Sequence, residues 1–222
     1  MILIPVKNLA QAKQRLADVL DQPARTELAQ TMLFDVLDAV DSWTNRSEVA
    51  LVTGDDFATH LAKQFNFEVI PDDANLGETD AIAMATQLCE SRGIESTLVI
   101  PGDIPLVTAD ELEKILLAAP AVGSVLVPAA DGRGTNAAFR RPAGLFSLCF
   151  GNDSFRPHLA AAHATEKPCV VVELPGVALD VDNPSDLRQL ATTPGETRTQ
   201  NLIRRWGFFN LPTINLPQAA GE

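Results

Sequence analysis

The stretch Thr97-Leu98-Val99-Ile100-Pro101-Gly102-Asp103-Ile104-Pro105-Leu106 decides the fold class of this chain. Residues 97–100 are apolar or β-branched, and Pro101-Gly102 ends the run. Such a run predicts a strand buried on both faces of a parallel sheet. Ligands of open α/β sheets bind beyond the carboxyl ends of the strands, so Asp103 is predicted to bind a ligand or a metal ion. The alternative is a turn aspartate that caps the next helix, but Thr108 is available for that role.

Similar apolar runs flank this stretch on both sides. They predict strands at residues 1–6, 49–52, 67–70, 124–127, 137–140 and 170–174. Helical spacing between them predicts helices at residues 23–40, 57–65 and 79–88, one that starts at Thr108, one through His158, and a final one from residue 183. This alternation predicts parallel strands joined by right-handed crossovers. Residues 137–140 follow a tight polar turn and are expected to pair antiparallel.

We therefore predict a single three-layer α/β domain over residues 1–191, with a mostly parallel central sheet and a small antiparallel addition.

Thr193-Pro194-Gly195 then breaks the last helix. Residues 192–222 are predicted to form a C-terminal extension that is docked or partly disordered. Its basic-aromatic segment Arg204-Arg205-Trp206-Gly207-Phe208-Phe209 favours docking and makes a homodimer plausible.

Composition excludes several classes of partner. The 222-residue chain has a net charge of −12 and a sequence pI near 4.6, which argues against a nucleic-acid partner. No apolar run approaches the ~18 residues of a membrane helix. Cys89, Cys149 and Cys169 show no metal-binding spacing and are predicted to be buried core thiols in a reducing compartment. We expect a cytoplasmic protein with no membrane contact.

Basic and acidic residues recur at the predicted strand ends. Lys7, Lys13 and Arg15 follow the first strand and could form a phosphate site, although amphipathic helices also turn such residues to solvent. Asp180 and Asp182 could join Asp103 in holding Mg²⁺, which takes oxygen ligands from one or two carboxylates and from substrate phosphates. Alternatively, Asp182 caps the last helix and Asp180 faces solvent.

Two glycine-containing loops supply neutral hydrogen-bonding groups. Thr135 and Asn136 end the stretch Asp131-Gly132-Arg133-Gly134-Thr135-Asn136, which could approach an anion or could be a plain hairpin turn. Gly151 and Ser154 precede a helix, where Ser154 could bind an anion or serve only as an N-cap. His158 and His163 are expected to pack or to face solvent. We find no Ser/His/Asp or Cys/His set and no Walker A pattern.

Six motifs, taken in order over residues 1–190, resemble the CofC/FbiD guanylyltransferases. They are Ile4-Pro5-Val6-Lys7, Ala12-Lys13 with Arg15-Leu16, Pro101-Gly102-Asp103-Ile104-Pro105-Leu106, Asp131-Gly132-Arg133-Gly134-Thr135-Asn136, Phe150-Gly151 with Ser154-Phe155 and His158, and Leu179-Asp180-Val181-Asp182 with Pro184 and Asp186-Leu187. One departure concerns the loop near the base, which reads Asn75-Leu76-Gly77-Glu78-Thr79-Asp80 here.

The resemblance implies a GT-A-like, Rossmann-like nucleotidyltransferase fold and an Mg²⁺-dependent guanylyltransferase of coenzyme F-420 biosynthesis. GTP would react with 2-phospho-L-lactate, phosphoenolpyruvate or 3-phospho-D-glycerate and release pyrophosphate. Asp103 with Asp180 or Asp182 would hold Mg²⁺. Thr135, Gly151 and Ser154, with Arg15 and Asn136, would bind the acceptor. Lys7 and Lys13 would face the GTP phosphates.

Elementary chemistry agrees with these implied roles, because an ionised phosphate nucleophile needs no general base. The protein has only to align two anions and to stabilise the leaving group. Two alternatives remain open: a cytidylyl- or sugar-nucleotidyltransferase of the same fold, and a nucleotide-binding domain without turnover. The second alternative requires that Asp103 and the pair Asp180/Asp182 do not converge.

Overall fold

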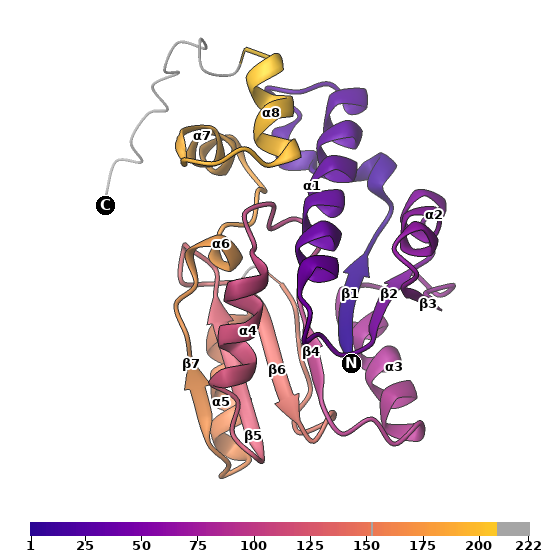
Figure 1. Cartoon of the computed structure of the whole chain (residues 1–222), viewed down its shortest axis with the longest axis vertical. Coiled ribbons are helices and arrows are strands. Elements are labelled where there is room, and N and C mark those ends of the chain that lie inside the picture. Colours follow the sequence, from indigo (N-terminus) through magenta and orange to yellow (C-terminus); the bar gives the residue numbers. More distant parts are fainter. Residues whose placement is uncertain (152, 208–222) are drawn as a thin grey trace, which may run out of the picture.

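A computed structural model gives the structure of the protein and describes residues 1–151 and 153–207. Seven strands form one sheet in the order β3-β2-β1-β4-β6-β5-β7 (Figure 1). The strands are β1 (Ile2–Val6), β2 (Val49–Thr53), β3 (Glu68–Pro71), β4 (Thr97–Val99), β5 (Gly123–Pro128), β6 (Thr135–Arg141) and β7 (Cys169–Val171). The chain runs from β1 outward to β3 and then returns to β4 on the other side of β1, which creates a topological switch point between β1 and β4.

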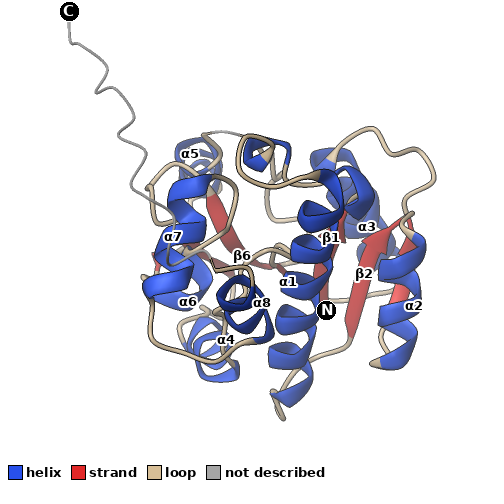
Figure 2. Ribbon diagram, turned by 90° about the horizontal axis from the view of Figure 1, so that it is seen from above, coloured by secondary structure: helices blue, strands red, loops and turns tan. Residues whose placement is uncertain are grey.

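Helices cover both faces of the sheet. The α-helices are α1 (Gln22–Ser42), α2 (Asp56–Gln64), α3 (Glu78–Ser91), α4 (Ala109–Leu117), α5 (Phe155–Ala164), α6 (Pro175–Ala178), α7 (Pro184–Thr192) and α8 (Arg198–Arg205). Ile2, Ile4 and Val6 of β1 pack with α1, α2 and α4, whereas Leu3 packs with α3 and α5 on the opposite face. Figure 2 shows α1 and α4 on one side of the sheet and α3 and α5 on the other. Side chains of a strand alternate between faces, so the apolar run of β1 fills both layers. The three-layer α/β prediction is confirmed.

Strand directions also follow the prediction. β1 pairs parallel with β2 and β4, and β2 pairs parallel with β3. β6 is antiparallel to both β4 and β5, and β5 is parallel to β7. The strand predicted at residues 170–174 is shorter: β7 ends at Val171, and Leu174 is the N-cap residue of the short helix α6, which begins at Pro175.

The chain between β1 and α1 forms two 3₁₀ helices, η1 (Leu9–Gln11) and η2 (Gln14–Leu16). Lys13 between them has a left-handed backbone with φ 56°, which costs an L-residue about 1–2 kcal/mol. Such strain persists only where surrounding contacts hold it, and it is often found at functional sites.

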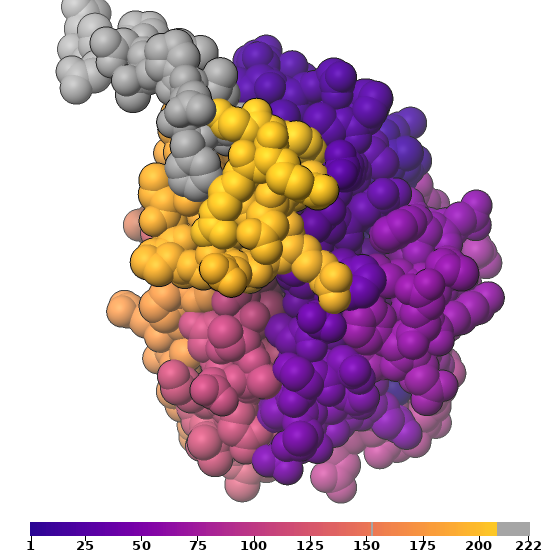
Figure 3. Space-filling view, turned by 45° about the horizontal axis from the view of Figure 1, so that its top comes forward, coloured from indigo at the N-terminus to yellow at the C-terminus, as the bar shows by residue number. Residues whose placement is uncertain are grey.

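The helix from Pro184 is not the final one, contrary to our prediction. It is capped by Asn183, and α8 follows after a turn, with Thr197 as its N-cap. The α8 segment lies in the predicted extension and docks on α1 (Figure 3). Ile203 is buried in a cluster with Leu28, Met32 and Leu187. Phe208 and Phe209 lie outside the described residues.

The cysteine prediction is wrong in part. Cys89 is buried, but Cys169 is half-buried and Cys149 is exposed, because Cys149 lies in the loop after β6 rather than in a core element. Within residues 1–151 and 153–207, none of the helices combines the length and apolarity that a bilayer crossing requires.

Candidate active site

Two cavities meet at the carboxyl ends of β1 and β4. The first, the lysine cavity, has about 400 Å³ and is lined by Lys7, Lys13 and the loop after β1. The second, the hydroxyl cavity, has about 500 Å³ and is lined by Thr135, Ser154 and Gly151. Both are lined by Glu78, Pro101, Asp103 and Asp182. The shared wall therefore lies at the switch point, where α/β sheets bind their ligands.

Asp103 and Asp182 converge on one ammonium group. Lys13 Nζ lies 2.5 Å from Asp103 Oδ2 and 2.8 Å from Asp182 Oδ1, and the Lys13 side chain is only 7% exposed. Burial acts to lower the pKa of Lys13, but the two carboxylates more than offset it, and the pKa is raised. A protonated lysine thus holds together two carboxylates that would otherwise repel each other.

Backbone contacts bring these two carboxylates together. Gly102 lets the turn after β4 lie close on α1, since a Cβ atom there would meet Leu33 Cδ1 at 3.2 Å. The Val181 N–H donates to the Asp103 carbonyl oxygen at 3.2 Å, which brings the segment of Asp180 and Asp182 beside Asp103. Asp182 is not a helix cap, because Asn183 caps α7. Burial would raise the pKa of Asp182, but the Lys13 charge and hydrogen bond, with Arg15, lower it.

Asp180 also reaches this cluster rather than facing open solvent. Asn136 Nδ2 donates to Asp180 Oδ1 at 3.0 Å and to the carbonyl oxygens of Val177 and Ala178. Burial raises the pKa of Asp180 to about 6; the Asn136 hydrogen bond opposes the shift, while the charges of Asp103 and Asp182 add to it. The amide nitrogen of Asn136 therefore orients Asp180.

Glu78 is a site residue that our sequence analysis did not single out. It is the first residue of α3 and lines both cavities. Burial and the Asp103 charge raise its pKa to about 7, against the lowering effect of Lys7. The only signal in the sequence was its place in the loop of residues 75–80 that departs from the family pattern.

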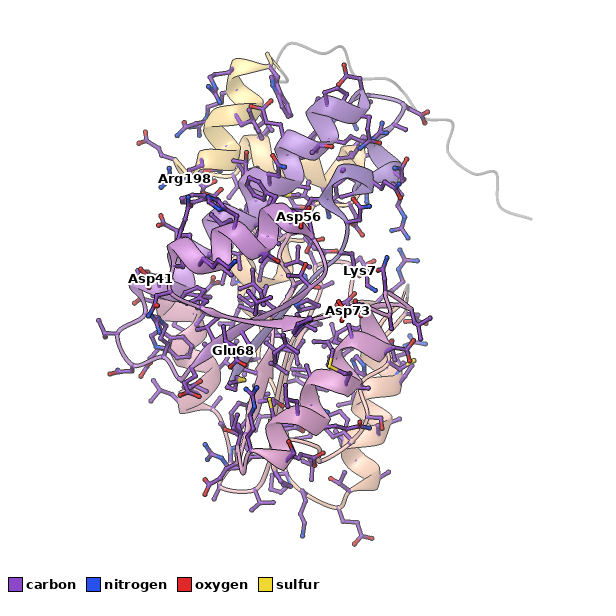
Figure 4. The ribbon with its side chains drawn as sticks, turned by 90° about the vertical axis from the view of Figure 1, so that its right-hand side faces the viewer. Lys7, Asp41, Asp56, Glu68, Asp73 and Arg198 are labelled. Atoms are coloured by element: carbon purple, nitrogen blue, oxygen red, sulfur yellow. The ribbon has the colours of Figure 1, made fainter. Side chains whose placement is uncertain are left out.

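Lys7 lies apart from the Asp103 cluster. Its Nζ is 3.5 Å from Asp72 Oδ2 and 3.3 Å from Asn75 Oδ1. A third cavity of about 620 Å³ adjoins it and is lined by Asp56 and Asp73 among others. Lys7, Asp56 and Asp73 lie at the same end of the sheet (Figure 4). Lys7 therefore stands between the lysine cavity and this third cavity.

The hydroxyl cavity contains every residue predicted to bind the acceptor. Arg15, Thr135, Asn136, Gly151 and Ser154 all line it. Ser154 occupies the N-cap position of α5, but its side chain makes no capping hydrogen bond; its Oγ instead accepts the Thr135 N–H at 3.0 Å. Arg15 is 60% exposed and reaches Asp182 Oδ2 at 3.4 Å.

Charge in the two cavities is nearly balanced. Their walls include the carboxyl groups of Glu78, Asp103, Asp131, Asp180 and Asp182, and the cationic groups of Lys7, Lys13, Arg15 and Arg133. Two phosphorylated substrates could not be neutralised by this set alone. Within residues 1–151 and 153–207, no three His, Cys, Asp or Glu side chains are already grouped as a metal site.

Comparisons with known proteins identify the family of this chain. A family model described as "Guanylyl transferase CofC like" matches residues 1–214. The chain is 32% identical over 190 residues to a phosphoenolpyruvate guanylyltransferase of Sphaerobacter thermophilus, covering 85% of this chain and 91% of the relative. It is 31% identical to a 3-phospho-D-glycerate guanylyltransferase of Colwellia psychrerythraea, covering 86% and 90%.

A solved structure supports the fold. A protein from Desulfovibrio desulfuricans G20, described as a nucleotide-diphospho-sugar transferase, superimposes with a TM-score of 0.73. The superposition covers 92% of this chain and 93% of that protein at 19% identity, so it shows the nucleotidyltransferase-like fold alone. Taken with the family match over nearly the whole chain, these similarities show that the chain belongs to the CofC-like guanylyltransferase family.

Proposed function

We propose that this protein transfers GMP from GTP to the phosphate of a small phosphorylated carboxylic acid and releases pyrophosphate. One observation carries the proposal: the lysine cavity and the hydroxyl cavity meet at Asp103 and Asp182. A donor triphosphate at Lys7 and Lys13 and an acceptor phosphate at Thr135 and Ser154 would then face each other across the carboxylates.

The acceptor belongs to a narrow class. The relatives described above are named for phosphoenolpyruvate and 3-phospho-D-glycerate, and each of these acids carries one phosphate and one carboxylate. Arg15 and the hydroxyls of Thr135 and Ser154 offer donors to both groups. The product would be the phosphoanhydride precursor used in coenzyme F-420 biosynthesis.

The transfer balances without a general base. An acceptor phosphate oxygen forms a bond to the α-phosphorus of GTP, and the bond from that phosphorus to the β-phosphate bridging oxygen breaks. Pyrophosphate leaves with the electron pair of that bond. The role of the chain is to align the two anions and to offset the charge of the leaving group, in which Lys7 and Lys13 take part.

The residues at the shared wall fit a magnesium ion. Their side chains offer oxygen ligands, which Mg²⁺ prefers, and the Lys13 ammonium that bridges Asp103 and Asp182 supports a cation-binding position there. Asp103, Asp182 and Asp180 would hold the ion. When bound, Mg²⁺ supplies neutralisation of the phosphate charge. Lys13 would then be released from one or both carboxylates and become available to the triphosphate.

The same geometry bears on the two alternative functions. A domain without turnover requires that the carboxylates do not converge, yet Asp103 and Asp182 contact one nitrogen atom. A cytidylyl- or sugar-nucleotidyltransferase remains compatible with the fold, which several such enzymes share.

Crossing four nucleoside triphosphates with three acceptors tests the proposal. We expect pyrophosphate release from GTP with phosphoenolpyruvate, 3-phospho-D-glycerate or 2-phospho-L-lactate, in the presence of Mg²⁺. CTP as the preferred donor would support the alternative enzyme. The absence of turnover with all twelve pairs would reject the enzymatic reading.

A further inference from the structure

His158 lies behind the hydroxyl cavity and makes contacts through both ring nitrogens. It is 1% exposed, in the first turn of α5. The Cys149 N–H lies 2.7 Å from Nε2, and Thr135 Oγ1 lies 2.9 Å from Nδ1. His158 therefore connects the loop that carries Gly151 to the Thr135 hydroxyl.

The direction of each hydrogen bond can be deduced. A backbone N–H can only donate, so Nε2 must be the acceptor and carries no proton. Burial, followed by the Arg140 charge, lowers the pKa of His158 to about 4, so the ring is neutral near pH 7. The single proton of the neutral ring is then on Nδ1, and Nδ1–H donates to Thr135 Oγ1.

This direction determines what Thr135 offers to a ligand. Its oxygen already accepts from His158, which leaves its own O–H proton to donate elsewhere. The Ser154 hydroxyl is likewise left with its proton to donate, because its Oγ accepts the Thr135 N–H. Among the described residues, no protein atom accepts the hydroxyl proton of Thr135 or of Ser154. A ligand in the cavity can therefore accept both protons. Both hydroxyls are thus prepared to donate to an anion.

The same ring holds the neighbouring loop. Besides accepting from Cys149, it packs edge-to-face against Phe150, with the ring centroids 5.3 Å apart. The Phe150 N–H donates to Thr79 Oγ1 at 2.9 Å, which anchors the loop from α3 as well. Gly151 follows directly and lines the cavity.

We propose that His158 is a positioning residue that makes the hydroxyl cavity selective for anionic acceptors, by holding Thr135 as a hydrogen-bond donor and fixing the loop before Gly151. This inference rests on the proposed function, because it assigns the acceptor phosphate or carboxylate to that cavity. His158 itself touches no substrate.

Two variants separate the two contacts of the ring. His158→Asn places an amide nitrogen near the position of Nδ1, so it can still donate to Thr135 but loses the bond from Cys149. His158→Gln places an amide oxygen near the position of Nε2, so it can still accept from Cys149 but loses the bond to Thr135. His163→Gln, an exposed position on the same helix, is the matched control.

Steady-state kinetics give the first readout. We expect His158→Gln and Thr135→Val each to raise KM for phosphoenolpyruvate about tenfold, as for loss of one hydrogen bond to an anion. KM for GTP should change less than twofold. The double variant His158→Gln/Thr135→Val should have a KM for phosphoenolpyruvate no higher than that of the more impaired single variant. Both changes interrupt the same chain of hydrogen bonds, so their effects should not add. His163→Gln should behave as the wild type. Equal changes in both KM values, or additive effects, would overturn the proposal.

Nuclear magnetic resonance gives a readout that does not depend on turnover. Two-bond ¹H–¹⁵N correlation spectra of the wild type should show His158 neutral, with its proton on Nδ1, from pH 8 to pH 5. A proton on Nε2 would overturn the proposal even if the kinetics agreed. If no acceptor turns over, the proposed function fails separately, and calorimetric binding of phosphoenolpyruvate then replaces KM. If His158→Gln does not fold, Thr135→Val and the spectra decide.

Discussion

At the scale of single residues, Lys13 explains how the site persists without its substrates. The two carboxylates that it bridges come from chain segments far apart in sequence, and together they would repel each other. A buried ammonium removes that repulsion. The left-handed backbone of Lys13 is the local cost of directing its side chain inward.

Asp103→Asn should fold normally but lose activity by about 10²–10³-fold, the range seen when one preorganised electrostatic contact is removed. The reason is that a neutral amide would bind Mg²⁺ and Lys13 more weakly than the carboxylate does. Pyrophosphate release at saturating GTP and acceptor measures the loss. Asp110→Asn, an exposed change on α4, should leave the rate unchanged. Wild-type activity of Asp103→Asn would show that Asp103 is only a turn residue.

Asp180 should make the magnesium requirement depend on pH. Its pKa is raised to about 6, mainly by burial, so below pH 6 the folded protein carries a proton where the ion would bind. The Mg²⁺ concentration for half-maximal activity should therefore rise about tenfold per pH unit below pH 6 and level off above it. Magnesium titrations at pH 8, 7, 6 and 5 measure this. A requirement that stays constant over this range would exclude Asp180 as a ligand.

At the scale of elements, the docking of α8 depends on one buried carboxylate of α1. Asp35 accepts hydrogen bonds from the Arg198 N–H at 3.0 Å, the Thr199 N–H at 2.8 Å and the Thr199 hydroxyl at 2.6 Å. The Arg198 guanidinium also lies 4.1 Å from the centre of the Phe34 ring. Asp35 thus acts for α8 as an N-terminal cap supplied by another helix.

Asp35→Ala should lower the free energy of unfolding by about 2–3 kcal/mol, because two buried donors of Thr199 and the part-buried Arg198 N–H lose their acceptor. Asp38→Ala is the matched control on the same helix. Asp38 is 60% exposed and lies 3.8 Å from Arg198, so its loss should cost less than about 0.5 kcal/mol. Urea unfolding of the two variants measures the difference. Equal effects would mean that α8 is held by its apolar face alone.

The sequence predicted helices and strands well where a single local pattern, such as a continuous apolar run or a polar turn, marked them. Alternating strands and helices of uninterrupted apolar pattern gave the parallel sheet, and the polar turn at residues 131–136 marked the antiparallel strand β6. It failed for α8, a short polar helix whose stability comes from Asp35 and from the cluster around Ile203. No local pattern contains those distant contacts.

The same distinction applies to the site. The position of Asp103 at the edge of the sheet was predictable, because this residue follows β4. Asp180 and Asp182 follow the short helix α6 rather than a strand, and the Val181 N–H bond to the Asp103 carbonyl oxygen brings them beside Asp103. The bridge by Lys13 was not predictable, since it depends on the backbone turn between η1 and η2. His158 was expected only to pack or face solvent, because its role comes from Cys149 and Thr135, which the fold alone brings to it.

At the scale of the whole molecule, an acidic protein must bind two anionic substrates. The net charge of −12 gives no general attraction for a nucleotide, so binding depends on local cations, of which the lysine cavity supplies Lys7 and Lys13. Because the two cavities share one wall, an acceptor phosphate in one cavity would face the α-phosphorus of a nucleotide in the other. The oxygen that joins acceptor and nucleotide in the product must come from the acceptor phosphate.

Isotope tracing tests that claim most directly. The protein is supplied with GTP, Mg²⁺ and phosphoenolpyruvate whose phosphate carries ¹⁸O, and the products are followed by ³¹P nuclear magnetic resonance. We predict a new phosphoanhydride with ¹⁸O in the bridge to the α-phosphorus, and unlabelled pyrophosphate. Formation of GMP and pyrophosphate without that bridge, or of labelled pyrophosphate, would contradict the account.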